Sequence, residues 1–387
     1  MAEGHVSISQ RGAERLRAGH LWVYRSDVRS AEAESGDIVC VKDERGNFVG
    51  RAFFSSSSQI TVRLLTREDI PVDREFFKAR VRVAAEYRKC VVEDTEACRL
   101  IYSEADLLPS LIVDRYADWL VVQTLSQGTE RRKEEFVSIL TELFSPRGIL
   151  ERNDPRVREL EGLERKVSLL YGEVPEEVVA SRNGIRFVHD LYKGQKTGGF
   201  LDQRENQRAA AAYVSGETLD CFTYHGGFAL TVAARATQVE GIDLSGPAIE
   251  ISRRNQQLNS ITNVSFREAN SFDALKACDD SGRRFDTVIL DPPAFAKNRD
   301  SVAAALRGYK EINLRALKLL KPGGLLVTSS CSYHIPEALF LQVIAEAAND
   351  VRRGVQIVER RTQSRDHPIL LTMPETHYLK CFILRAI

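Results

Sequence analysis

Residues 217–243, ETLDCFTYHGGFALTVAARATQVEGID, contain the pattern that decides the fold. A short apolar run is followed by a glycine pair at Gly226 and Gly227, a helix-length apolar segment, and a second apolar run that ends in Asp243. Strand, glycine turn, helix and strand in this order are typical of a βαβ unit in a parallel sheet. Such sheets bind ligands beyond the carboxyl ends of their strands, so both strand ends are candidate site segments.

The same alternation continues to the end of the chain. Apolar runs separated by amphipathic segments occur at VSFREA (264–269), DTVILDPP (286–293), GLLVTSS (324–330), VQIVER (355–360) and HYLKCFILRA (377–386). The last two runs have no clear helical period between them, and two prolines interrupt the connection, so they are expected to pair antiparallel. The pattern predicts an α/β, Rossmann-like domain whose mostly parallel seven-stranded sheet ends in an antiparallel strand. This arrangement is more typical of methyltransferases than of dinucleotide dehydrogenases.

The residues before this region have a different pattern. Short β-rich runs with turns between them fill 6–65 and predict a small β-barrel. A helical period follows over 69–89, and strands mixed with one helix over 95–179 predict a small α+β unit. We therefore expect three domains, at 1–72, 73–180 and 181–387.

Composition limits the class of protein. Lys+Arg and Asp+Glu both number 54, so any surface for nucleic acid must be local. Seven cysteines are scattered without CxxC pairs or zinc spacing, which predicts reduced thiols and no metal. No apolar run approaches the roughly 20 residues that span a bilayer, and the N-terminus lacks a signal pattern. A soluble cytoplasmic protein is expected.

Three features on the nucleotide side favour an adenosine-containing cofactor. The glycine pair permits close backbone approach, Asp243 can accept hydrogen bonds from ribose hydroxyls, and Asn270 follows the third strand, where it could contact adenine. The phosphate-cradling G-x-G-x-x-G is absent, which disfavours a nicotinamide oxidoreductase. Plain turn glycines and a helix-capping Asp remain the alternative explanation of each feature alone.

Two strand ends on the reaction side carry the candidate chemistry. Asp291-Pro292-Pro293 stiffens one of them and leaves a carboxylate and carbonyls to accept from an amino-substituted base. Cys331 ends the neighbouring strand, and its thiolate could add to C6 of cytosine and so activate C5, with Asp291 sharing a proton at N3. A rigid loop and a cysteine that merely packs are the alternatives.

Long ordered stretches resemble the RlmI-like family of 23S ribosomal RNA cytosine-C5 methyltransferases, which carry an N-terminal PUA domain. The stretches include GHLWVYRSDV, SGDIVCVKDERGNFVGRAFF, EADLLPSLIVDRY, GQKTGGFLDQRENQR, DCFTYHGGF, LDPPAFAKN, GYKEINLRALKLLKPGG, TSSCS and PETHYLK. The resemblance implies that the first domain is a PUA barrel that binds RNA and that the cofactor is S-adenosylmethionine. Cys331 matches the nucleophile, Asp291 the base-holding motif, and residues 195–204 part of a cofactor lid.

The expected site follows from the motifs and the resemblance together. The catalytic pair is Cys331 and Asp291. The expected cofactor-contacting residues are Phe200, Gln203, Asp220, Phe222, Thr223, Tyr224, Gly226, Gly227, Asp243, Leu244, Asn270, Ser271, Asp291 and Pro292. The expected RNA-contacting residues are Pro293, Phe295, Lys297, Arg299 and Lys310, in a segment that has seven basic and three acidic residues when counted from Asp291 to Cys331 inclusive. A solvated helix face is the alternative explanation of that charge.

Three positions depart from the family pattern. Asn270 stands where family members often carry Asp. Ala294 stands where two-cysteine RNA cytosine methyltransferases carry a second cysteine, and Leu107 stands where glycine is usual. The sequence thus predicts an S-adenosylmethionine-dependent RNA methyltransferase that forms 5-methylcytosine in large-subunit ribosomal RNA. A purine nitrogen methyltransferase that uses Asp291-Pro292-Pro293, and a non-catalytic RNA-binding assembly factor, remain the alternatives. A homodimer is left open.

Overall fold

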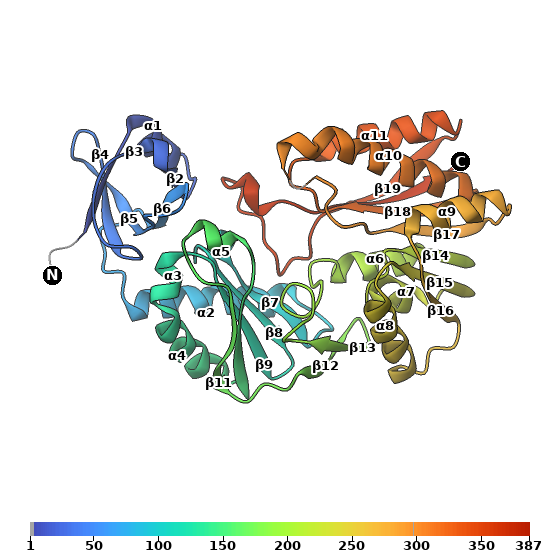
Figure 1. Cartoon of the computed structure of the whole chain (residues 1–387), viewed down its shortest axis with the longest axis horizontal. Helices are drawn as coiled ribbons and strands as arrows, with labels where there is room; N and C mark the ends of the chain where they lie inside the picture. Colours follow the sequence, from blue (N-terminus) through green and yellow to red (C-terminus); the bar gives the residue numbers. More distant parts are fainter. Residues whose placement is uncertain (1–3, 297) are drawn as a thin grey trace. The chain divides into compact units, whose positions relative to one another are not determined.

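The computed structural model describes residues 4–296 and 298–387 (Figure 1). These residues form two compact units that are not continuous in sequence. The N-terminal unit comprises residues up to Ala180 together with His189–Leu201 and Arg365–Thr376, and the C-terminal unit comprises Ser181–Val188, Asp202–Ser364 and His377–Ile387. Because the units interleave in this way, the predicted domain limits 1–72, 73–180 and 181–387 stay a prediction.

The first sheet of the N-terminal unit has six strands in the order β2-β6-β5-β4-β1-β3. Its strands are β1 (His5–Ile8), β2 (Trp22–Tyr24), β3 (Val28–Glu32), β4 (Ile38–Asp43), β5 (Phe48–Phe54) and β6 (Ile60–Thr66), and helix α1 (Gln10–Arg17) packs with them. The alternation of β4 places Val39 and Val41 in the core with Leu64 and Leu16. Helix α1 begins after Ser9, whose side chain accepts a hydrogen bond from the Gly12 N–H.

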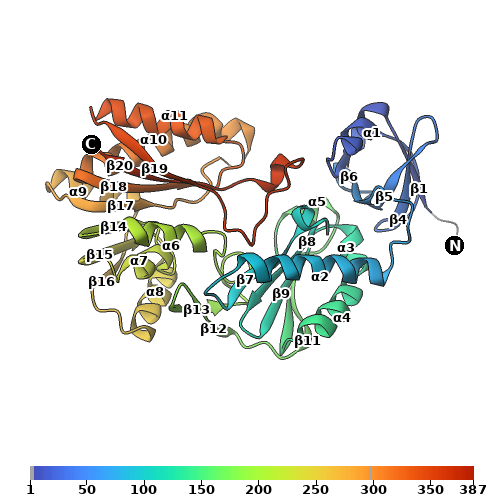
Figure 2. The same cartoon turned by 180° about the vertical axis from the view of Figure 1, so that it is seen from behind.

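The second sheet of this unit has five strands in the order β11-β10-β9-β8-β7. The elements are β7 (Ala97–Tyr102), β8 (Leu111–Tyr116), β9 (Trp119–Thr124), β10 (Gly148–Asn153), β11 (Lys166–Gly172), α2 (Arg74–Val91), α3 (Gln127–Arg131), α4 (Lys133–Phe144) and α5 (Val157–Leu160). Figure 2 shows α2 lying along the sheet, and Phe77 and Val81 of α2 enter the shared core. The helix predicted over 69–89 starts at Arg74, because the Asp73 side chain accepts from the Phe76 N–H.

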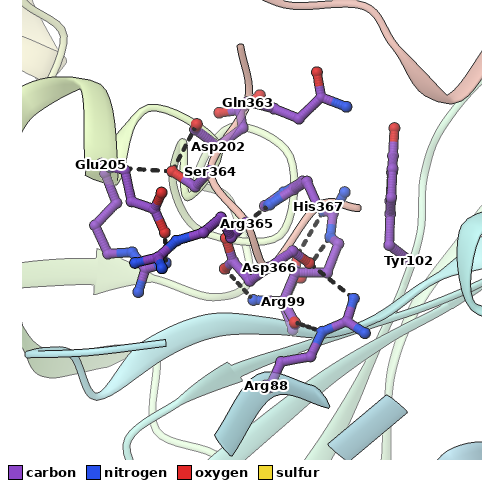
Figure 3. Close-up of polar contacts among 12 residues, drawn as sticks. Arg88, Arg99, Tyr102, Asp202, Glu205, Gln363, Ser364, Arg365, Asp366 and His367 are labelled. Carbon is purple, nitrogen blue, oxygen red and sulfur yellow. Dashed lines mark hydrogen bonds and ion pairs between the residues drawn. The ribbon is translucent and has the colours of Figure 1, made fainter. Parts of the chain in front are cut away.

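A two-stranded sheet, β12 (Glu177–Arg182) and β13 (Ile185–Asp190), follows in the chain. The excursion Arg365–Thr376, far away in sequence, is held by α2 and β7 in the N-terminal unit (Figure 3). Arg88 donates to the Asp366 carbonyl at 2.8 Å, and the Arg99 N–H donates to the Asp366 carboxylate at 2.9 Å. Tyr102 donates to the Thr376 carbonyl at 3.2 Å. The connection between the last two strands is a loop with one 3₁₀ turn, Pro374–Thr376, as its two prolines led us to expect, and these contacts hold it in place.

The C-terminal unit is built on a seven-stranded sheet in the order β16-β15-β14-β17-β18-β20-β19. Its strands are β14 (Glu217–Cys221), β15 (Gln238–Asp243), β16 (Val264–Glu268), β17 (Phe285–Leu290), β18 (Leu320–Ser330), β19 (Val355–Arg361) and β20 (Lys380–Ala386). β20 runs antiparallel to both of its neighbours, and the pairs among β14 to β18 are parallel. The predicted seven-stranded sheet with an antiparallel last strand is confirmed.

Helices cover both faces of this sheet (Figure 1). They are α6 (Arg204–Tyr213), α7 (Gly227–Val232), α8 (Gly246–Leu258), α9 (Ser271–Asp280), α10 (Val302–Leu319) and α11 (Glu337–Asp350). The period-two alternation of β20 sends Phe382 and Leu384 into the core under α9, α10 and α11. Cys381 and Ile383 enter the core under α6 and α7. Both faces are buried, so the carboxyl ends of the strands are left to form a site.

Candidate active site

The turn after β14 has a strained backbone. Phe222 and Tyr224 have φ of 65° and 50°, values that side chains rarely adopt, and Gly226 has φ of 80°. A Cβ on Gly226 would lie 2.9 Å from Cζ of Phe266, so glycine is required here by packing as well as by φ. Strained residues of this kind cluster at ligand sites, where the surrounding structure holds them in place. The predicted nucleotide turn is therefore a rigid loop at the carboxyl end of the first strand.

Asp220 is the buried acid of this turn. Its Oδ2 accepts from the Thr223 hydroxyl at 2.6 Å and from the Ala229 N–H at 3.0 Å. Its Oδ1 is buried and has no hydrogen-bond partner among the described residues. Burial raises the pKa of Asp220 to about 7, the charges of Asp291 and Asp243 raise it further, and the two hydrogen bonds oppose the rise. A cationic amino group of a ligand would satisfy the oxygen that lacks a partner.

The next two strand ends carry the predicted ribose and adenine residues. Asp243 accepts from the Tyr224 N–H and from the Ser245 N–H, both at 2.9 Å, so it also ties the first turn to the second. Asn270 caps α9 by accepting from the Phe272 and Asp273 N–H groups, so its Oδ1 is engaged in the helix start. Leu244 is exposed and Ser271 is buried. Asn270 thus retains its amide N–H₂ as the group available to an adenine edge.

Asp291 follows β17 and contacts Gln203, the residue that immediately precedes α6. The side chain of Gln203 donates to the Asp291 carboxylate at 2.6 Å and accepts from Asn206 at 2.6 Å. Gln203 and Asn206 are buried, whereas Asp291 is half-buried. The structure thus brings Gln203 and Asp291 together, a contact that the sequence did not indicate. Phe200 belongs to the N-terminal unit and is not among the residues that the C-terminal unit brings together.

Cys331 directly follows β18, next to the end of β17. Its thiol lies 3.9 Å from the carbonyl oxygen of Pro292 and is oriented to donate to it. Cys331 is half-buried, whereas Cys221, Cys278 and Cys381 are buried in the unit's cores. The two predicted catalytic side chains therefore come from adjacent strand ends, and the thiol is not enclosed in the apolar interior.

The predicted RNA residues have different surroundings. Pro293 is exposed, and Phe295 is half-buried with its ring centroid 4.6 Å from that of Tyr309. Lys310 forms an ion pair with Asp350 at 2.9 Å, which offsets part of its charge. Lys297 lies outside the described residues, and Arg299 begins a short 3₁₀ turn. Of Pro293, Phe295 and Lys310, whose exposure the structure describes, Pro293 is the most exposed.

Sequence reasoning missed three buried polar residues. Asn206 donates to Gln203, and Tyr309 and Lys380 form hydrogen bonds with the serines on either side of Cys331. The one available signal was Lys380 itself, a charged residue within the apolar run LKCFIL (379–384). Within residues 4–296 and 298–387, no helix combines the length and apolar character needed to cross a bilayer. The same residues contain no cluster of three or more His, Cys, Asp or Glu with the arrangement of a metal site.

Comparisons with known proteins agree with this geometry. Residues 6–67 match the PUA-like domain family, and residues 163–376 match the S-adenosylmethionine-dependent methyltransferase family. The crystal structure of SMU.776 complexed with SAH is similar over 98% of this chain and 99% of the SMU.776 chain, with a TM-score of 0.85 at 20% sequence identity. A methyltransferase from Agrobacterium tumefaciens covers 76% and 90%, with a TM-score of 0.53 at 17% identity. The fold and site thus define a PUA-containing, S-adenosylmethionine-dependent methyltransferase.

Relatives in sequence narrow the class. The ribosomal RNA large subunit methyltransferase I of Tolumonas auensis is 40% identical over 95% of this chain and 96% of that protein. The protein of the same name from Shewanella denitrificans is 40% identical over 97% and 98%. The chain belongs to the ribosomal RNA large subunit methyltransferase I family. S-adenosylmethionine is its cofactor, as predicted.

Proposed function

We propose that this enzyme methylates C5 of a cytosine in large-subunit ribosomal RNA, with Cys331 as the nucleophile. The observation that supports this most directly is the half-buried Cys331 thiol beside the Asp291-Pro292 strand end. A nitrogen methyltransferase needs the Asp-Pro-Pro carbonyls but has no use for a thiol at that position. The relatives named for large-subunit ribosomal RNA supply the substrate class.

In the proposed reaction the Cys331 thiolate forms a bond from Sγ to C6 of the cytosine. The π electron pair of the C5–C6 bond then becomes nucleophilic at C5, and a proton shared between Asp291 and N3 supports the addition. S-adenosylmethionine, when bound, supplies an electrophilic methyl group. C5 would form a bond to that methyl group while the methyl–sulfonium bond breaks and its electron pair stays on the cofactor's sulfur. A base then takes the C5 proton, the C5–H electron pair restores the C5–C6 double bond, and the Sγ–C6 electron pair returns to Cys331. Ala294 offers no second thiol, so this chain must release the product with other groups.

The residues around the first three strand ends fit the cofactor. Asp220 has a buried carboxylate oxygen without a partner, which suits the cationic amino group of the methionine moiety. Asp243 can accept from ribose hydroxyls through the remaining lone pairs of its oxygens. The amide of Asn270 can donate to adenine. Gln203 holds Asp291, and we propose that it keeps this carboxylate directed to the base.

The test is mass analysis of nucleosides from large-subunit ribosomal RNA incubated with the enzyme and S-adenosylmethionine. We expect 5-methylcytidine from the wild-type enzyme and no product from Cys331→Ala, with cofactor binding by calorimetry unchanged in the variant. Cys90→Ala is the matched control, because Cys90 is exposed on α2 of the N-terminal unit. A methylated purine, or full activity of Cys331→Ala, would refute the proposal. Absence of cofactor binding by the wild type would favour a non-catalytic RNA-binding factor.

A further inference from the structure

Lys380 is a buried cation in the C-terminal unit. It is the first residue of β20 and pairs across the sheet with Ser330 of β18. Only 3% of the residue is exposed. Its Nζ donates to the Ser332 carbonyl at 2.7 Å and to the Tyr378 carbonyl at 2.9 Å. Among the ion pairs of the described part of the chain, none includes Lys380. An ammonium group buried against neutral carbonyls lacks the anion that usually compensates such a charge.

The groups that face Lys380 identify the anion that is missing. Burial lowers the pKa of Lys380 to about 8, and Cys331 and Glu337 oppose that change. Glu337 begins α11 and its side chain is 38% exposed, so water screens its charge. Tyr309 on α10 is buried beside Cys331, and burial raises the pKa of Tyr309, which keeps its hydroxyl neutral. Of these two acidic groups, Cys331 has the larger effect on the pKa of Lys380.

The loop that carries Cys331 is held on both sides of the thiol. Before it, the Ser330 hydroxyl donates to the Tyr309 hydroxyl at 3.0 Å. After it, the Ser332 hydroxyl accepts from the Ala296 N–H at 3.1 Å and lies 3.0 Å from the Tyr309 hydroxyl. Lys380, on the neighbouring strand β20, adds a hydrogen bond from its Nζ to the Ser332 carbonyl.

We propose that Lys380 is a positioning residue that fixes the Cys331 loop and supplies the positive charge that favours the Cys331 thiolate. The inference rests on the proposed role of Cys331 as nucleophile. A thiolate beside the Asp291 carboxylate is disfavoured by like charge, and a nearby cation offsets that repulsion. When the Cys331 thiol loses its proton, the negative thiolate attracts the positive ammonium group of Lys380.

The test is the pH dependence of Cys331 alkylation in the free, full-length enzyme. Iodoacetamide is added over a pH series, and the modification of each cysteine is measured by peptide mass spectrometry. Cys90, exposed on α2, is an internal reference in the same sample. In the wild type we expect the midpoint of Cys331 alkylation to lie at lower pH than that of Cys90. This comparison needs no variant, and the opposite order would overturn the proposal.

Three variants separate charge from packing. Lys380→Gln keeps donors for the two carbonyls but removes the charge, and we expect its Cys331 midpoint to rise by about one pH unit, with roughly tenfold slower alkylation near neutral pH. Lys380→Arg keeps the charge and should restore most of the rate. Lys321→Met, at the other end of β18, removes a lysine that pairs with Asp286 and should leave the Cys331 profile unchanged.

The outcomes distinguish this proposal from the proposed function. A Lys380→Gln profile equal to that of the wild type, with Cys90 also unchanged, would assign Lys380 a purely structural role. An altered profile together with full methylation by Cys331→Ala would leave the electrostatic pair intact but remove Cys331 from the reaction. Alkylation uses neither RNA nor S-adenosylmethionine, so its result does not depend on which nucleoside is methylated.

Discussion

Replacing Asp220 with Asn should change the stability of the C-terminal unit in a pH-dependent way. Burial raises the pKa of Asp220 from 3.8 to about 7. The unfolded chain loses the Asp220 proton near its ordinary pKa, whereas the folded protein keeps that proton to about pH 7. Folding therefore takes up a proton between these values. The stability contribution of the raised pKa is present below the unfolded value and is lost as the pH rises through the folded value.

The structure sets the magnitude of this effect. The difference between 3.8 and about 7 corresponds to about 4 kcal/mol, at about 1.4 kcal/mol per pH unit. Asn is neutral, and its amide N–H groups lack an assured acceptor in the buried site, which costs about 1–3 kcal/mol at every pH. The pH dependence of the stability difference between the variant and the wild type therefore comes from the Asp220 carboxyl group. As the pH rises from about 5 to about 8, we expect the free energy of unfolding of Asp220→Asn to increase by about 3 kcal/mol relative to that of the wild type.

Native-state hydrogen exchange of peptides that cover β14 measures this difference, because it reports on one part of a multidomain chain. Each variant is compared with the wild type at the same pH, so that intrinsic exchange cancels. Glu250→Gln is the control, since Glu250 is exposed on α8, and its curve should run parallel to that of the wild type. A parallel curve for Asp220→Asn would show that the buried carboxyl group is not kept neutral by the fold.

Three further substitutions have defined expectations. Gly226→Ala should destabilise the protein by about 1–3 kcal/mol in thermal unfolding and weaken cofactor binding, because φ is 80° and the new Cβ would meet Phe266 at 2.9 Å. Leu107→Gly should raise stability by about 0.5–1 kcal/mol, because Leu107 has φ of 56° and is 38% exposed. Gln203→Leu should slow methylation about tenfold or more, because it removes a hydrogen bond to the Asp291 carboxylate.

Each expectation has an outcome that contradicts it. Unchanged stability and affinity in Gly226→Ala would show that the loop adjusts freely. A loss of stability in Leu107→Gly would mean that its side chain contributes more than its backbone strain costs. Wild-type methylation by Gln203→Leu would show that Asp291 does not need the hydrogen bond from Gln203. Asn206→Leu is the matched control for that variant, since Asn206 bonds Gln203 and the Thr362 carbonyl, and it should have a weaker effect.

The order of strands and helices in the C-terminal unit follows from local patterns. Apolar runs such as 286–290 and 324–328 alternate with amphipathic helices, and burial on both faces demands that pattern. The reversed last strand could also be predicted, because no helical period separates its run from the preceding one. The excursion Arg365–Thr376 could not, because its anchors, such as Arg88 to the Asp366 carbonyl, join residues 278 positions apart. No periodicity encodes such a contact.

The proximity of Asp291 and Cys331 was predictable from the order of the strands. Asp291 and Cys331 each end a parallel strand, and neighbouring strands bring their ends together. Lys380 was missed because β20 runs the other way, so that its first residue, not its last, reaches this edge. The sequence suggested that Lys310 could bind an RNA phosphate, but in the structure Lys310 forms an ion pair with Asp350 on α11. That pairing depends on helix packing, which the sequence of α10 alone does not determine.

The central claim is that Cys331 bonds covalently to cytosine C6 during methylation. RNA that contains 5-fluorocytosine tests it most directly, because fluorine cannot leave C5 as a proton does, so the methylated base stays bound to sulfur. With S-adenosylmethionine present, we expect the wild-type enzyme to form an RNA–protein complex that survives denaturing electrophoresis, and Cys331→Ala to form none. A stable complex with Cys331→Ala, or none with a wild type that methylates unmodified RNA, would contradict the account.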